Sequence, residues 1–150
     1  MRVQSWTAIH AVFAILAATP AMAAEDTWRD VYTCGKSEGQ SFYYDETGWT
    51  PDGIANGVII LRRKGRDFDL FIGDATSSGF SAREDGATVV GREEDGIIQV
   101  LAVYPMMMTM ETYLFSAPKD GHTRLAWTSS KRALPTERAS VFVSECFERK

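Results

Sequence analysis

Four of the six methionines of this 150-residue chain lie within five residues, in the segment VYPMMMTMETYLF. Thioether sulfur is a soft ligand that suits Cu(I), so this run is a candidate copper site. Methionine also fills irregular gaps in a core and is frequent on adaptable binding surfaces. Three hypotheses stay open: a binding rim, plain core packing and a Cu(I) site. We favour the rim and predict no metal and no cofactor, because Pro105 interrupts a strand just before Met106, Met107, Met108 and Met110.

Catalytic chemistry has few candidates. Asp67 and Asp69 could serve as a pair of glycosidase carboxylates or as ligands of a hard cation, although strand alternation alone places both on one solvated face. His122 follows the Asp120-Gly121 turn signal, where we expect a solvated loop residue. The G-x-S-x-G, phosphate-loop and H-E-x-x-H motifs are absent from the sequence. We therefore predict that the protein is not an enzyme, with an envelope hydrolase that uses these carboxylates as an alternative.

Two clusters suit binding. Four cations in the segment RRKGR could contact an anionic lipid head group or an acidic partner, and they are Arg62, Arg63, Lys64 and Arg66. The segment SFYYDETGW is rich in aromatic residues, which are favoured at interfaces because a large apolar body carries a polar tip. Its members Tyr43, Tyr44 and Trp49 are predicted to join the methionines in a partner-binding or ligand-binding rim.

The N-terminus indicates export. Arg2 precedes an apolar run at residues 11–18, and the small-residue pattern Ala21-Met22-Ala23 follows. This arrangement is typical of a secretory signal peptide, so we predict cleavage after Ala23 and a periplasmic or secreted protein. Residues 1–23 are then the signal peptide, and residues 24–150 form one domain. No later run has the roughly 20 apolar residues of a transmembrane helix.

The charge and the cysteine content narrow the possible functional class of the protein further. Loss of Arg2 with the signal peptide leaves 15 basic and 20 acidic residues, a net charge of −5, which gives no support to nucleic-acid binding. Cys34 and Cys146 remain in an oxidising compartment, where such a pair usually forms a structural disulfide. They lack the close C-x-x-C spacing of a redox-active pair.

Hydrophobic residues alternate with a period of two along the chain, as in RDFDLFIG, and turn signals recur at short intervals. Asp95-Gly96 and Asp120-Gly121 supply hairpin turns, and Lys64-Gly65 joins another pair of strands. VYTC and QSFYY predict a hairpin that turns at residues 37–39, followed by an irregular interval at residues 45–56. We expect an all-β, single-domain antiparallel meander of about 8–10 strands, closed into a small β-barrel with one disulfide.

These features favour an exported, non-enzymatic binding module of the cell envelope that contacts a protein partner through the Met/aromatic rim. The second hypothesis is a carrier of a small apolar ligand in a lipocalin-like barrel. We predict a monomer in either case.

Overall fold

The computed structural model describes residues 27–44, 48–74, 77–133 and 136–149, so the predicted signal peptide lies outside the described residues. Within those ranges, no helix is long and apolar enough to span a bilayer. The elements in chain order are β1 (Arg29–Tyr43), β2 (Trp49–Ile54), β3 (Val58–Lys64), β4 (Asp67–Asp74), β5 (Ser77–Ser81), β6 (Thr88–Glu94), β7 (Ile97–Tyr104), the 3₁₀ turn η1 (Pro105–Met107), β8 (Thr109–Phe115), β9 (His122–Ala133) and β10 (Thr136–Glu148).

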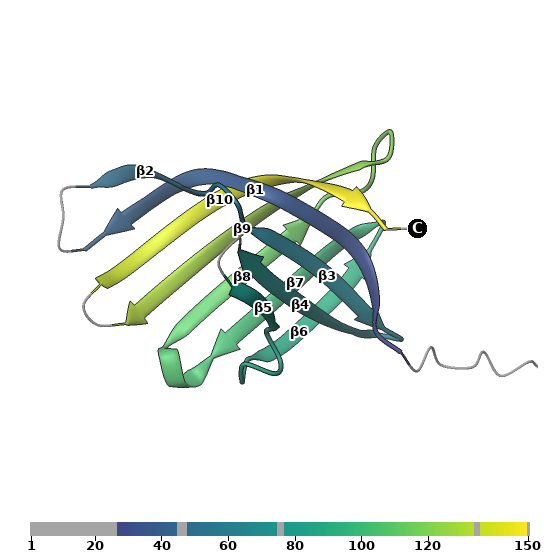
Figure 1. The fold of residues 1–150 in the computed structure, drawn as a ribbon, viewed down its shortest axis with the longest axis horizontal. Coiled ribbons are helices and arrows are strands. Elements are labelled where there is room, and N and C mark those ends of the chain that lie inside the picture. The colour runs from purple at the N-terminus through teal and green to yellow at the C-terminus, as the bar shows by residue number, and fades with distance from the viewer. Residues whose placement is uncertain (1–26, 45–47, 75–76, 134–135, 150) are drawn as a thin grey trace, which may run out of the picture.

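All of these strands belong to one sheet in the order β5-β4-β3-β1-β10-β9-β8-β7-β6, with β2 paired to β1 beside this path. Every pairing is antiparallel, and most join strands that follow each other in sequence (Figure 1). The predicted all-β meander is therefore confirmed. Asp95 and Asp120 have φ of 52°, as the two Asp-Gly turn signals require.

The predicted hairpin near the N-terminus is wrong, because β1 runs unbroken through residues 37–39. Its register with β10 shifts between Cys34 and Ser37, which is a β-bulge around Gly35 and Lys36. A bulge adds one residue to one strand, so two side chains three positions apart both face the interior. Cys34 and Ser37 are both buried for this reason. The interval that was expected to be irregular instead contains β2.

One face of the curled sheet, called here the inner face, holds the hydrophobic core. Tyr113, Trp127 and Phe142 are direct cross-strand neighbours on β8, β9 and β10. Their rings stack with centroids 5.8 Å and 4.3 Å apart, and all three side chains are buried. Gly39 on β1 lies opposite Phe142, where an added Cβ would approach the Val141 carbonyl oxygen to 1.9 Å. The position therefore requires glycine.

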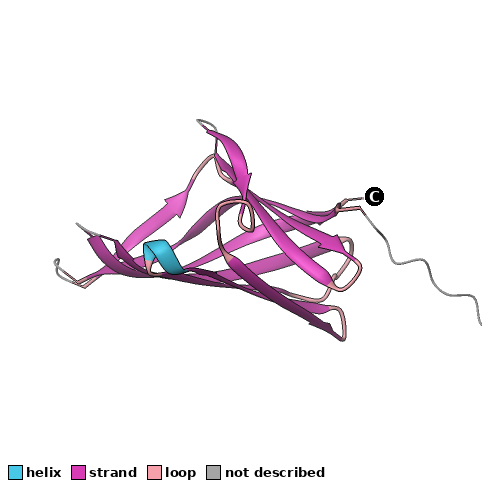
Figure 2. Ribbon diagram, turned by 90° about the horizontal axis from the view of Figure 1, so that it is seen from below, coloured by secondary structure: helices cyan, strands magenta, loops and turns pink. Residues whose placement is uncertain are grey.

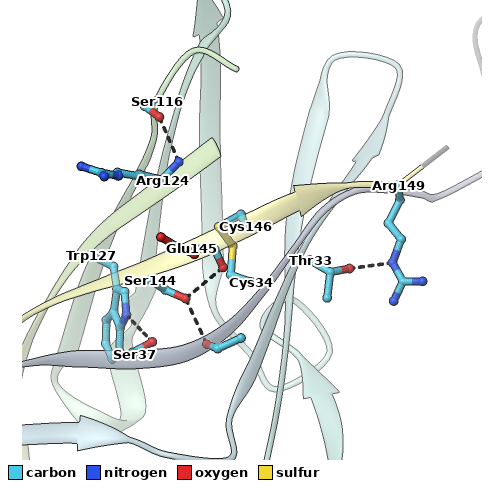
Figure 3. Close-up of a disulfide and its surroundings, with 11 residues drawn as sticks. Thr33, Cys34, Ser37, Ser116, Arg124, Trp127, Ser144, Glu145, Cys146 and Arg149 are labelled. Carbon is cyan, nitrogen blue, oxygen red and sulfur yellow. Dashed lines mark hydrogen bonds between the residues drawn. A yellow bond between two sulfur atoms is a disulfide. The ribbon is translucent and has the colours of Figure 1, made fainter. Parts of the chain in front are cut away.

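The predicted disulfide is present and joins the first and last strands (Figure 3). Cys34 and Cys146 are direct partners in the β1/β10 ladder, with Cα atoms 4.0 Å apart, and both are fully buried. Beside the bridge, the Ser144 hydroxyl donates to the Gly35 carbonyl at the bulge. The bridge thus links the two strands at the centre of the sheet.

The sheet is strongly curled, but the described strands do not complete a hydrogen-bonded ring, so the predicted closed barrel is not confirmed (Figure 2). Side chains bridge β4 and β6 instead. Arg83 donates from Nε to the Phe68 carbonyl at 2.9 Å and from Nη2 to the Val89 carbonyl at 2.8 Å. The Phe68 ring also packs against the backbone of Gly91. We call this boundary between β4 and β6 the seam.

Candidate functional site

The methionine segment forms the connection between β7 and β8. Met106 and Met107 belong to η1, Met108 has a left-handed backbone with φ of 45°, and Met110 lies on β8. Met106 is 96% exposed, and the other three are also exposed. The connection is held by the Thr109 hydroxyl, which donates to the Met107 carbonyl at 3.1 Å, and by the Arg132 amide, which donates to the Met108 carbonyl at 3.3 Å. The four methionines therefore do not follow the strand alternation that would align Met106, Met108 and Met110.

The aromatic segment divides between the two faces of the sheet. On the outer face, the Phe42 ring meets Tyr44 and Trp49 edge-on, with centroids 5.3 Å and 5.7 Å away. Trp49 is 57% exposed and Tyr44 is also exposed. Tyr43 faces the opposite way, and its hydroxyl accepts a hydrogen bond from Arg138 at 3.3 Å. The structure thus brings Tyr44 and Trp49 together and separates Tyr43 from them.

Strand register places the two predicted segments at one end of the same face. Trp49 pairs with Phe42. The same row of cross-strand partners continues from Phe42 through Ala139 and Ser130 to Met110. Direct cross-strand partners point to the same side, so Trp49 and Met110 share the outer face, about 19 Å apart over four strand spacings. Figure 1 shows the helical turn η1 and the β1/β2 pair at the same end of the molecule. We call this surface the Met–Trp rim, formed by Met106, Met107, Met108, Met110, Tyr44 and Trp49.

Exposed apolar side chains continue from the rim along the outer face. Val141, Val143 and Leu114 are all exposed on β10 and β8. A groove of about 720 Å³ follows, lined by apolar residues that include Leu114, Val143 and Phe147 and by charged Arg124 and Glu145. The exposed hydroxyls of Thr112 and Thr128, which bond to each other, lie on this face between Met110 and Leu114, so polar side chains interrupt the apolar surface.

A buried polar cluster on the inner face escaped the sequence analysis. The Glu111 carboxylate accepts hydrogen bonds from the Tyr113 hydroxyl at 2.6 Å and the Ser129 hydroxyl at 3.1 Å. Lys131 Nζ lies 3.6 Å from the same carboxylate. The signal was present in the alternation of TMETYLF, which places Glu111 on the same face as Tyr113 and Phe115.

Burial is the main influence on the pKa values of two inner-face tyrosines, Tyr113 and Tyr104. It raises the pKa of Tyr113 well above the usual range, and the neighbouring Glu111 charge raises it further. The pKa of Tyr104 is raised for the same two reasons, in the same order. Both phenols therefore stay protonated, and Tyr113 acts as a hydrogen-bond donor to a carboxylate that its neighbours already satisfy. The polar groups around Glu111 thus satisfy one another, whereas the buried Tyr104 hydroxyl has no hydrogen-bond partner among the described residues.

A second polar group lies on the inner side of β1, β2 and β10. The Ser41 hydroxyl donates to Asp52 at 2.6 Å and accepts from Ser140 at 2.6 Å. Arg138 lies 3.6 Å from the same Asp52 carboxylate. Each hydroxyl and charge has a partner, as buried polar groups need.

Comparison with known proteins yields no match: no family model, curated protein or solved structure resembles the chain. Among the residues that the structure describes, no group of three or more His, Cys, Asp or Glu side chains could hold a metal ion.

The candidate catalytic residues occupy different environments. Asp69 is buried beneath the segment between β5 and β6, where it accepts hydrogen bonds from the Ser81 hydroxyl at 2.6 Å and the Arg83 amide at 3.2 Å. Asp67 is exposed at the start of β4. His122 begins β9, and its ring meets Phe147 edge-on at 5.3 Å. Asp69 thus has a structural role, as the anchor of the segment that carries Arg83.

The four cations of RRKGR do not act as one patch. Arg62 faces outward, pairs with Asp30 at 3.2 Å and lies over the Phe71 ring. Arg63 faces the other way and forms an ion pair with Glu93 on β6. Lys64 ends β3, and Arg66 is exposed in the turn before β4. Strand alternation therefore divides the predicted anion contact between two faces.

Proposed function

We propose that the protein is a non-enzymatic binding module of the cell envelope that contacts a protein partner through the Met–Trp rim. The observation that supports this most is the shared cross-strand row of Trp49 and Met110 on the outer face. It joins two exposed apolar segments, distant in sequence, into one surface.

The chemistry of the rim suits a protein surface. Trp49 is rigid and large, which are the properties of residues that carry most of the binding energy at interfaces. Burial of a methionine contributes about 1.5 to 3 kcal/mol, and freezing it costs about 1.5 to 2 kcal/mol. The methionines therefore add little affinity each, but their flexible side chains adapt to the shape of a partner. The rim needs the tryptophan as its anchor.

Export is part of the proposal. A signal peptide that is cleaved after Ala23 would deliver the protein to the periplasm or to the outside of the cell. The buried disulfide is compatible with that destination, because disulfides form and persist in oxidising compartments. Closure of the sheet into a small barrel is likewise a proposal, supported by the side chains that bridge the seam.

The alternatives have less support. A lipocalin-like carrier needs interior space, whereas the inner face is occupied by the buried rings of Tyr113, Trp127 and Phe142. A hydrolase that uses Asp67 and Asp69 would have to act with a buried, hydrogen-bonded Asp69. A Cu(I) site would need the methionine sulfurs to converge, and Met110 belongs to a strand whereas Met106 to Met108 do not.

Site-specific cross-linking in the native envelope tests the proposal. A photoreactive side chain replaces Tyr44, a member of the Met–Trp rim, and the yield of a cross-linked protein is compared between two double variants. Met106→Leu with Met108→Leu keeps apolar volume and should leave the yield unchanged. Met106→Asp with Met108→Asp should abolish it, because a carboxylate must be desolvated at an apolar contact.

The control places the same photoreactive group at the exposed Lys119, in the connection between β8 and β9, at the end of β8 opposite η1. Equal yields from the leucine and aspartate variants would contradict the proposal. So would the same product from the Lys119 position.

A further inference from the structure

The exposed sulfur-bearing residues of this protein are gathered in the Met–Trp rim. Residues 24–150 contain four methionines and two cysteines. The two cysteines are joined in the disulfide and are fully buried. The four methionines are all rim residues, and their exposed fractions run from 46% for Met107 to 96% for Met106. A reagent that attacks accessible sulfur would therefore modify one surface of the molecule.

The reaction open to these side chains is oxidation by a peroxide. The thioether sulfur carries an unshared electron pair that attacks the weak O–O bond. With hydrogen peroxide, an S–O bond forms as the O–O bond breaks, and the proton of the transferred hydroxyl goes to the departing hydroxide, which leaves as water. The sulfur loses two electrons, the peroxide gains them, and the product is methionine sulfoxide.

Oxidation at the rim should leave the fold in place. No hydrogen bond within the described part of the chain uses a methionine sulfur. The connection between β7 and β8 is held by backbone groups instead. The Met108 amide donates to the Pro105 carbonyl at 3.3 Å, and the Thr109 hydroxyl donates to the Met107 carbonyl at 3.1 Å. An oxygen atom added to these sulfurs therefore changes the chemistry of the surface and removes no contact of the interior.

We propose that the four rim methionines form a reversible oxidation site, at which a peroxide switches off the contact between the Met–Trp rim and its protein partner. A sulfoxide turns a flexible apolar side chain into a polar one. Its oxygen must be desolvated when a partner covers the rim, as the carboxylate of an aspartate must be. Methionine sulfoxide reductases reverse the step, since thiols supply two electrons, become a disulfide and release the oxygen as water. The effect on the contact rests on the proposed function, whereas the oxidation itself does not.

Peptide mass spectrometry after timed exposure to hydrogen peroxide tests the oxidation site without a partner. The folded protein is compared with the same protein unfolded in urea, where every methionine is accessible. Met106 in the folded protein should oxidise within about twofold of its rate in the unfolded chain, because almost all of its surface is exposed. If it oxidises about tenfold more slowly, the sulfur is shielded and the proposal is overturned. The oxidised protein should unfold at the same urea concentration as the untreated protein, and a lower midpoint would show damage to the fold instead of a switch.

The cross-linking assay with the photoreactive group at position 44 tests the switch. The purified protein is treated with hydrogen peroxide and freed of it before it meets the envelope, so the partner is not oxidised. The yield should fall at least about tenfold, and methionine sulfoxide reductases for both sulfoxide epimers should restore it. The matched control changes all four rim methionines to leucine, which keeps apolar volume without sulfur, so its yield should not respond to peroxide. Trp49 is retained in this control, so damage to the tryptophan would lower both yields.

Two results would overturn the switch. Peroxide could leave the yield of the methionine protein unchanged, or it could lower the yield of the leucine variant equally. A failure of the proposed function has a different signature, because no cross-linked product would form from either protein before peroxide is added. The switch would then fall with the contact that it controls, while the oxidation rates would still decide whether the site exists.

Discussion

Arg83→Met should open the seam between β4 and β6. Methionine keeps much of the apolar stem of Arg83 but removes the guanidinium that donates to the carbonyls of Phe68 and Val89. The backbone amide of residue 83 still reaches Asp69, so the local chain path should persist. The substitution therefore removes a bridge between two strands that share no ladder.

The size of the effect follows from these two contacts. A hydrogen bond from a charged group contributes about 1.5 to 3 kcal/mol, which would give about 3 to 6 kcal/mol for the pair. Arg83 is exposed, so water can replace part of what is lost. We therefore expect the free energy of unfolding to fall by about 2 kcal/mol. Arg124→Met is the matched control, because Arg124 is also exposed and its hydrogen bond to Ser116 uses the backbone amide. Such surface changes usually stay within about 0.5 kcal/mol.

Urea unfolding monitored by tryptophan fluorescence measures both variants, since Trp127 is buried in the folded state. Hydrogen exchange provides a second readout, in which the amides of β6 should lose more protection than those of β9 and β10. If Arg83→Met unfolds at the same urea concentration as the control and β6 keeps its protection, side-chain closure of the seam is refuted.

Three further predictions concern stability. Replacing Cys34 and Cys146 by serine should lower the free energy of unfolding in urea by about 4 to 5 kcal/mol, because the bridge closes a loop with a sequence separation of 112; a loss under about 1 kcal/mol would contradict this. Gly91→Ala should cost about 1 to 3 kcal/mol in the same assay, since its Cβ would lie 2.5 Å from Phe68 Cδ2, whereas Gly35→Ala, with no atom within 4 Å, should be tolerated better. The raised pKa values of Tyr104 and Tyr113 mean that above pH 10.0 the unfolded chain loses protons that the folded protein keeps. The stability that these two protonated phenols contribute is thus fully present below pH 10.0 and should be lost as the pH rises above it. Phenolate absorbance during alkaline titration should show these two tyrosines ionising only on unfolding, and their ionisation in the folded protein would rule out the explanation.

Most strands and turns follow from the sequence alone because they depend on neighbouring residues. Alternation in RDFDLFIG and TMETYLF indicates strands, since successive side chains of a strand face opposite sides. The Asp-Gly pairs at 95–96 and 120–121 predict tight turns, because aspartate and glycine tolerate positive φ. The disulfide was predictable for a different reason: the chain contains only two cysteines.

Strand register could not be predicted, because it depends on which distant segments form hydrogen bonds with each other. The bulge at Gly35 and Lys36 allowed one long β1 where a hairpin was expected, and it changed which β1 residues face inward. Register also decided that Trp49 and Met110 share a face and that Tyr43 does not. No local pattern contains that information.

The charged groups also divide into features that the sequence predicts and features that only the tertiary fold decides. The sequence identified RRKGR as a cluster, but alternation in β3 sends Arg62 and Arg63 to opposite faces, and the tertiary fold pairs Arg63 with Glu93 across the seam. Glu111 reads as an ordinary strand residue until Tyr113, Ser129 and Lys131 surround it. The backbone geometry of a strand is local, whereas the environment of a charge depends on every strand that folds against it. For this reason the sequence determined the elements and the bridge, and only the tertiary structure decided the rim and the seam.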